Sequence, residues 1–180
     1  MAHPARALQV LVAGRATALT GPPIIVEQIS RVPGFEDADL TALTTAHVGG
    51  ARVPPGLLLA WQAKGVWLRQ IYGQTEIGGS ATVMPRAEAA EHPEKCGWGT
   101  IFTKIRVVDG DGEDLPPGQQ GQILLRGPGM MPGYWRNQEA TAAALAGGWL
   151  HTGDVGVLDE RGYLTFVDRT AQQVAVVTGA

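Results

Sequence analysis

Strand-like and helix-like segments alternate along the N-terminal half of the chain, and this alternation most constrains the fold. Residues 17–20, 44–48 and 66–70 are short runs of apolar and β-branched residues, bounded by glycine or proline, which favours strands. Between them, residues 22–30 and 54–64 are longer and begin with proline pairs, which suit the first turn of a helix. A β-α-β-α-β order predicts a parallel sheet with right-handed crossovers, and hence an α/β fold.

Each predicted strand is followed by a loop that contains glycine. The loops are Gly21-Pro22, Gly49-Gly50-Ala51 and Tyr72-Gly73-Gln74-Thr75-Glu76. The carboxyl ends of parallel strands meet at one edge of a sheet, where ligands bind in open α/β folds. We therefore expect the three loops to form one side of a binding site.

The C-terminal half has a different pattern, with short alternating strands and strong turn signals. Residues 104–107 and 121–126 read as strands, and 154–158 with 163–167 read as a hairpin. Asn137 can cap a short alanine-rich helix. We expect a partial α/β subdomain at residues 1–85, a small antiparallel β lobe at 86–168, and a hinge with an atypical tail at 169–180.

Charge and cysteine content exclude some classes of function. The 180 residues carry a net charge of −3, which gives no basic footprint for nucleic acid. The single Cys96 fits a reducing compartment and a cytoplasmic location. The four histidines lack metal-ligand spacing, and no apolar run reaches transmembrane length.

The loop from Tyr72 to Glu76 combines three groups that suit a nucleotide and its metal. The Tyr72 ring can stack on a base, the Thr75 hydroxyl can donate to a phosphate oxygen, and the Glu76 carboxylate can hold Mg²⁺. The alternative is a polar loop between a strand and a helix, and the five residues alone leave both interpretations open.

Four ordered motifs give the chain a resemblance to the adenylate-forming (AMP-binding) superfamily, which includes acyl-CoA synthetases, peptide-synthetase adenylation domains and luciferases. They are Gly49-Gly50-Ala51, Tyr72–Glu76, residues 121–128 with Gly133-Tyr134-Trp135, and residues 148–154 leading to Asp168-Arg169. The chain looks most like the fatty-acyl-CoA, or acid–CoA ligase, branch.

The resemblance implies a role for each matching residue. Thr75 and Glu76 would be catalytic, Thr75 through the α-phosphate and Glu76 through Mg²⁺, and Asp168 would be the hinge. The residues implied to bind the nucleotide or to line the mouth of the acyl pocket are Gly49, Gly50, Ala51, Tyr72, Gly73, Thr75, Asp154 and Arg169, of which Asp154 and Arg169 would contact the ribose.

The implied reaction has two steps and uses ATP, Mg²⁺ and coenzyme A. A carboxylic acid attacks the α-phosphate of ATP to give an acyl-adenylate and pyrophosphate, and a thiol then displaces AMP. The resemblance also implies a Ser/Thr/Gly-rich phosphate loop and an adenylation lysine, neither of which has a counterpart among the 180 residues. We therefore expect a fragment of a ligase that needs further parts of the ligase chain and does not form acyl-adenylate alone.

Simpler interpretations of several residues remain. Asp154 could bond its own turn, and Arg169 could be a solvated surface charge. Structural roles are the expectation for a larger set: His47, Arg126, Tyr134, Trp135, Trp149 and His151.

Two other functions stay open. One is a non-catalytic remnant that binds AMP or acyl-adenylate, and the other is a piece of a peptide-synthetase adenylation domain. The tail at residues 173–180 resembles the first strand and glycine turn of a short-chain dehydrogenase, or is an unrelated apolar segment.

Overall fold

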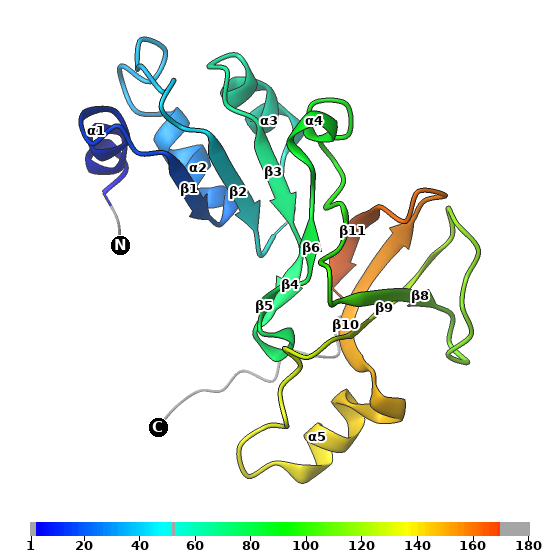
Figure 1. Ribbon diagram of the computed structural model, residues 1–180. Helices are drawn as coiled ribbons and strands as arrows, with labels where there is room; N and C mark the ends of the chain where they lie inside the picture. The colour runs from blue at the N-terminus through cyan, green and yellow to red at the C-terminus, as the bar shows by residue number, and fades with distance from the viewer. Residues whose placement is uncertain (1–2, 52, 170–180) are drawn as a thin grey trace. The chain divides into compact units, whose positions relative to one another are not determined.

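The computed structural model describes residues 3–51 and 53–169 of the chain (Figure 1). These residues divide into two compact units, which we describe separately. The first unit comprises residues 3–73 (without residue 52) and 82–97, and the second comprises 74–81 and 98–169. The predicted dehydrogenase-like tail lies outside the described residues.

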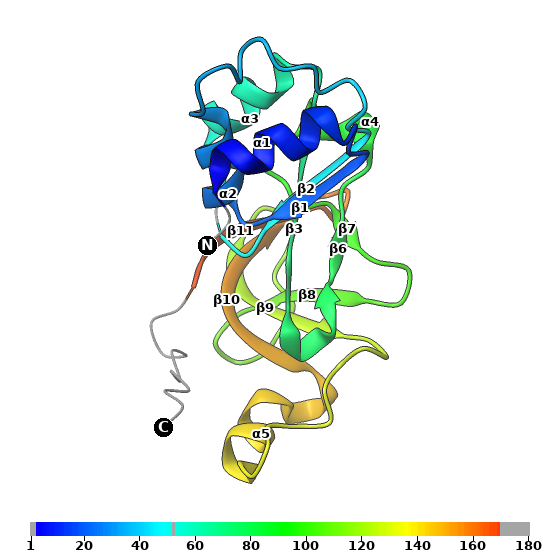
Figure 2. The same ribbon diagram turned by 90° about the vertical axis from the view of Figure 1, so that its left-hand side faces the viewer.

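The first unit is a parallel sheet with helices, as the alternation predicts. Strands β1 (Ala18–Gly21), β2 (Thr45–Gly49) and β3 (Leu68–Ile71) are all parallel in the order β1-β2-β3. The unit also contains α1 (Pro4–Ala13), α2 (Pro23–Ser30), α3 (Pro55–Gln62), the short helix α4 (Arg86–Ala89) and the two-residue strand β6 (Thr82–Val83). Helices α2 and α3 lie on one side of the sheet (Figure 2), the side that right-handed crossovers give to both.

Aromatic packing fixes α3 to α2 in the core of the first unit. Trp61 is fully buried, and its indole Nε1–H donates to the carbonyl of Val26 at 3.3 Å. The ring of Phe35 meets Trp61 edge-on at 5.2 Å between centroids. Burying the large ring with its one donor satisfied holds the two helices in a single packing arrangement.

The sheet of the first unit has one buried face and one half-buried face. Ala46 and Val48 of β2 are buried, whereas His47 between them is half-buried and lies beside its register partner Arg69. Burial, followed by the nearby Arg69 charge, lowers the pKa of His47 below its usual range. The position of His47 within the sheet agrees with a structural role.

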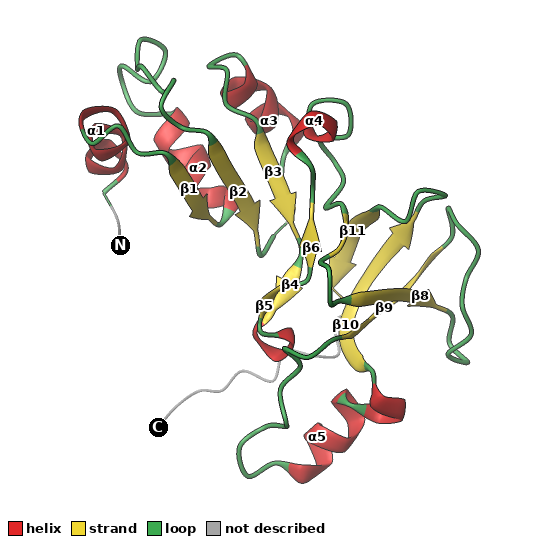
Figure 3. Ribbon diagram, viewed as in Figure 1, coloured by secondary structure: helices red, strands yellow, loops and turns green. Residues whose placement is uncertain are grey.

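The second unit is an antiparallel sheet in the order β11-β10-β9-β8, again as predicted (Figure 3). Its strands are β8 (Lys104–Val108), β9 (Gln120–Arg126), β10 (Leu150–Leu158) and β11 (Leu164–Arg169), with shorter elements β5 (Gly79–Ser80), β7 (Trp98–Gly99), η1 (Thr75–Ile77), α5 (Gln138–Ala144) and η2 (Ala146–Gly148). Strand β4 (Gly73–Gln74) crosses the boundary between the units.

Side chains at turns set two of these elements. Asn137 caps α5, since its Oδ1 accepts from the backbone N–H of Ala140 at 3.0 Å, which confirms the predicted cap. In the β10–β11 hairpin, Asp159 Oδ1 accepts from the N–H groups of Arg161 and Tyr163.

Among the described residues, no helix has the length and apolar character that crossing a bilayer requires.

Candidate functional site

The predicted site residues are divided between the two units. In the first unit, the glycine loops follow strand ends that share one edge of the sheet, since Gly21 pairs with Val48 and Gly49 with Ile71. A Cβ on Gly49 would lie 2.7 Å from the Ile71 carbonyl oxygen, so any other residue would force Ile71 or the strand end to shift. Gly50 adopts φ +85°, a left-handed conformation that favours glycine.

Ala51 and Tyr72 differ in their access to solvent. Ala51 is exposed in the bend after Gly50, next to the same sheet edge. Tyr72 is only 6% exposed, and its N–H donates to the buried Thr82 hydroxyl at 2.8 Å. The predicted stacking ring therefore offers little accessible face in this structure. Gly73 is half-buried at the start of β4.

Thr75 and Glu76 lie on a short 3₁₀ turn that the second unit holds in place. Gly78 ends the turn in a left-handed conformation at φ +85°. The loop around Gly129 packs so closely that a Cβ on Gly129 would lie 2.6 Å from the Ile77 carbonyl oxygen. The Glu76 carbonyl accepts from the Met131 N–H at 2.7 Å. This packing leaves the Thr75 side chain exposed, with its hydroxyl available to a ligand.

The Glu76 carboxylate accepts a hydrogen bond from a tyrosine. The Tyr134 hydroxyl donates to Glu76 Oε1 at 3.0 Å. Burial, followed by this hydrogen bond and the Glu76 charge, raises the pKa of Tyr134. Tyr134 therefore stays a neutral donor and fixes the orientation of the carboxylate.

Asp154 is the centre of a hydrogen-bond network in the second unit. The residue is fully buried, at 0% exposure, and both carboxylate oxygens accept hydrogen bonds. Gln74 Nε2 donates to Asp154 Oδ2 at 2.7 Å and to the Thr152 carbonyl at 2.9 Å. Arg169 Nε donates to Asp154 Oδ1 at 2.8 Å, forming an ion pair. A buried carboxylate needs such partners, because it costs several kcal/mol when left unpaired.

A bulge in β10 places Asp154 in this network. The pairing of β10 with β9 shifts between His151 and Val155, and Gly153 adopts φ +70° within the shift. Bulges of this kind redirect a side chain and occur often beside active sites. The Thr152 hydroxyl accepts from the Asp154 N–H at 3.1 Å and donates to the Ile123 carbonyl at 2.7 Å, which fixes the bulge.

Asp168, the predicted hinge, and Arg169, a predicted ribose contact, end strand β11. Arg169 is the register partner of Asp154, and its side chain is 55% exposed. Asp168 is also exposed, and its Oδ1 accepts from the Arg169 N–H at 2.7 Å. Because Arg169 forms an ion pair with Asp154, the alternative interpretation of Arg169 as a merely solvated surface charge is wrong.

Two residues that contact predicted site side chains, Gln74 and Tyr134, carried no predicted site role. Gln74 lies inside the motif but was given no role, and its bond to Asp154 joins residues 80 positions apart. Tyr134 was expected to have a structural role only, and its hydroxyl donates to Glu76. Its neighbour Trp135 is 86% exposed in a turn, where Arg136 lies over its ring, so it does not belong to the core. The one available signal was the side-chain amide of Gln74 inside the motif, between Gly73 and Thr75.

The donor set fits Mg²⁺ only as a metal shared with a substrate. Among the described residues, no three His, Cys, Asp or Glu side chains lie close enough to hold a metal ion together. Glu76 could supply one carboxylate ligand. Mg²⁺ commonly takes one or two carboxylates and completes its shell with water and substrate phosphates.

Comparison with known proteins identifies the family of the chain. Residues 1–135 match the family model described as AMP-binding enzyme. A feruloyl-CoA synthase from Amycolatopsis sp is 37% identical over 171 residues, which cover 95% of this chain and 35% of the relative. The chain thus spans about a third of the length of the curated relatives it matches.

Solved structures agree in fold. The amide bond synthetase McbA K483A mutant from Marinactinospora thermotolerans matches with a TM-score of 0.83 and 34% identity, covering 93% of this chain and 35% of that one. The o-succinylbenzoate CoA synthetase MenE from Bacillus subtilis, in complex with ATP and magnesium ion, matches with a TM-score of 0.80 and 25% identity over 93% of this chain and 34% of that one. The chain belongs to the AMP-binding enzyme family and is a partial, acid–CoA ligase-like member of it.

Proposed function

We propose that this chain forms the nucleotide-binding part of an ATP-dependent acid–CoA ligase. The observation that carries the proposal is the buried Asp154 carboxylate, held by Gln74 and Arg169 in the unit that also presents Thr75 and Glu76. Gln74 and Thr75 are neighbours in the chain, so one backbone segment carries both a partner of Asp154 and the exposed hydroxyl. These groups match the needs of a ribose and a phosphate respectively.

In this proposal Asp154 binds the ribose hydroxyls. Each carboxylate oxygen has two lone pairs, so Asp154 can accept from a hydroxyl while it keeps Gln74. Access requires the Arg169 side chain to move aside, which its 55% exposure permits. Arg169 then contacts the ribose from the solvent side, and the neighbouring Asp168 serves as the hinge.

Thr75 and Glu76 act on the phosphates. The Thr75 hydroxyl donates to the α-phosphate, and the Glu76 carboxylate, oriented by Tyr134, supplies a ligand for Mg²⁺. Bound Mg²⁺ would neutralise the phosphate charge and act as a Lewis acid. Donors aimed at the oxygens of the transferring phosphorus lower the barrier to attack by a carboxylate.

The family resemblance assigns the remaining adenylate contacts to motif residues of the first unit. Tyr72 stacks on the adenine, once the groups that enclose its ring move. The backbone of Gly49, Gly50 and Ala51, with Gly73, lines the adenine and the mouth of the acyl pocket. Coenzyme A is the second substrate of the complete ligase.

Calorimetric titration with AMP and with 2′,3′-dideoxy-AMP tests the ribose contact. We expect the chain to bind AMP more tightly, because a hydrogen bond to a charged group contributes ~1.5–3 kcal/mol, or roughly tenfold or more in affinity. Asp154→Asn should lose this preference. Asp111→Asn, which makes the same change in an exposed turn, should keep it. Equal binding of both nucleotides by the unmodified chain would refute the assignment.

A second titration identifies the acid. Three non-hydrolysable acyl-adenylate analogues, which carry a hydroxycinnamoyl, a long-chain fatty acyl or an aminoacyl group, should bind unequally. We expect the hydroxycinnamoyl or the long-chain fatty acyl analogue to bind more tightly than the aminoacyl analogue. A preference for the aminoacyl analogue would support a peptide-synthetase domain instead. We expect no carboxylate-dependent exchange of pyrophosphate into ATP by the 180-residue chain, and detectable exchange would contradict this.

A further inference from the structure

Two cations oppose each other on neighbouring strands of the second unit. Lys104 on β8 and Arg126 on β9 are register partners, so their side chains leave the same face of the sheet. Both are exposed, and neither forms an ion pair with any carboxylate in the described part of the chain. Like charges directly opposite each other destabilise a sheet. A bound anion would remove that cost.

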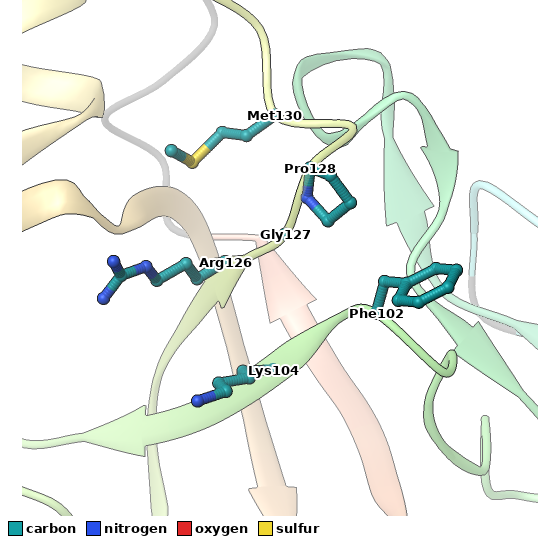
Figure 4. Close-up of a pocket in the computed structure, with 6 residues that line it drawn as sticks. All are labelled: Phe102, Lys104, Arg126, Gly127, Pro128 and Met130. Atoms are coloured by element: carbon teal, nitrogen blue, oxygen red, sulfur yellow. The ribbon is translucent and has the colours of Figure 1, made fainter.

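A pocket of about 380 Å³ opens at this pair. Its lining consists of Phe102, Lys104, Arg126, Gly127, Pro128 and Met130. Figure 4 shows the side chains of Lys104, Arg126 and Met130 projecting to the same side, whereas the ring of Phe102 projects to the other. The pocket therefore offers two positive groups beside the apolar surface of Met130 and Pro128.

Trp149 holds the Arg126 guanidinium in position. The Arg126 carbon Cζ lies 5.9 Å from the centroid of the Trp149 ring, and Arg106 lies over the same ring at 5.3 Å. These are cation–π distances. Arg106 forms an ion pair with Asp114, so its charge is already compensated. Arg126 is positioned in the same way but keeps an uncompensated charge.

We propose that this pocket binds a small organic phosphate monoester. At neutral pH a phosphate monoester carries nearly two negative charges and three acceptor oxygens, which matches the two cations. Arg126 donates two parallel hydrogen bonds to the phosphate, and Lys104 adds a mobile positive charge. Met130 and Pro128 contact the apolar body of the ester. This site is separate from Asp154 and its partners, and the proposal goes beyond the function proposed above.

Titration with phenyl phosphate tests the proposal. Phenyl phosphate has a dianionic head and an apolar ring, whereas phenyl sulfate has one charge and inorganic phosphate has no ring. We expect phenyl phosphate to bind more tightly than either, with a dissociation constant that rises with salt. The NMR signals of the Arg126 side chain and of the Met130 methyl group should shift during the titration.

Single variants locate the binding. Lys104→Gln and Arg126→Gln should each weaken binding of phenyl phosphate roughly fivefold or more, since each removes a charged partner. Arg136→Gln makes the same charge change outside the pocket and should leave binding unchanged. Arg136 contacts Trp135 and is not among the lining residues.

Three results would overturn the proposal. The first is equal weakening by all three variants, which would indicate non-specific attraction. The second is equal binding of phenyl sulfate and phenyl phosphate. The third is binding to vesicles that contain phosphatidic acid without binding to the soluble esters, which would assign the cations to a lipid surface. A failure here leaves the AMP titration unaffected, because that experiment depends on Asp154.

Discussion

Replacing Gln74 with methionine should destabilise the second unit. The change keeps the length of the side chain and removes two hydrogen bonds, one to the Asp154 carboxylate at 2.7 Å and one to the Thr152 carbonyl at 2.9 Å. A bond to a charged group contributes ~1.5–3 kcal/mol and a neutral one ~0.5–1.5 kcal/mol. Because Gln74 is half-buried, we take the low end of each range and expect a loss of about 2 kcal/mol.

Urea unfolding and amide hydrogen exchange measure this loss. At this chain length a loss of 2 kcal/mol corresponds to a fall in Tm of about 4–8 °C. Exchange should accelerate most at the amides of β10 beside Asp154. Gln119→Met is the matched control, because Gln119 is exposed in a turn and its side chain makes no hydrogen bond with the described residues.

A double-mutant cycle assigns the effect to the contact itself. Gln74→Met, Asp154→Ala and the combined variant give the coupling free energy between the two side chains, which we expect to be about 1 kcal/mol or more. The loss of the Arg169 partner occurs in both arms that lack Asp154, so it cancels. Additivity within ~0.5 kcal/mol would refute the argument that Gln74 holds Asp154.

Two further predictions concern single groups. Gly49→Ala should cost about 1–3 kcal/mol in urea unfolding, because its Cβ would meet Ile71, whereas Gly56→Ala in open space on helix α3 should stabilise slightly; equal effects would contradict the packing argument. In a spectrophotometric titration Tyr134 should ionise above its ordinary pKa of 10.0. Its contribution to stability should be complete below pH 10.0 and be lost as the pH rises through the raised pKa. Glu76→Gln should lower the pKa of Tyr134, and an unchanged pKa would rule out the Glu76 contact.

The alternating pattern was sufficient to predict the architecture of both units. The hydrophobic period and the positions of proline and glycine are local signals. They predicted the three parallel strands and the capped helix α5 close to their observed bounds. The ends of β10 and β11 were less accessible. Residues 150–153 were assigned to a motif rather than a strand, and β11 runs on to Arg169. Local sequence signals do not determine over how many residues a strand pairs with its neighbour in the sheet.

The partners of the site residues depend on contacts that no local pattern encodes. Asp154 and Thr75 could be selected because their chemistry suits a nucleotide, but the role of Gln74 follows only from a bulge in β10, which aims Asp154 at it. The bulge needs Gly153 in a left-handed conformation and Thr152 as its internal bridge. Thus the glycine and threonine before Asp154 act by orienting a buried carboxylate, and the test of that role is whether Asp154 keeps its coupling to Gln74 when the Thr152 hydroxyl is removed.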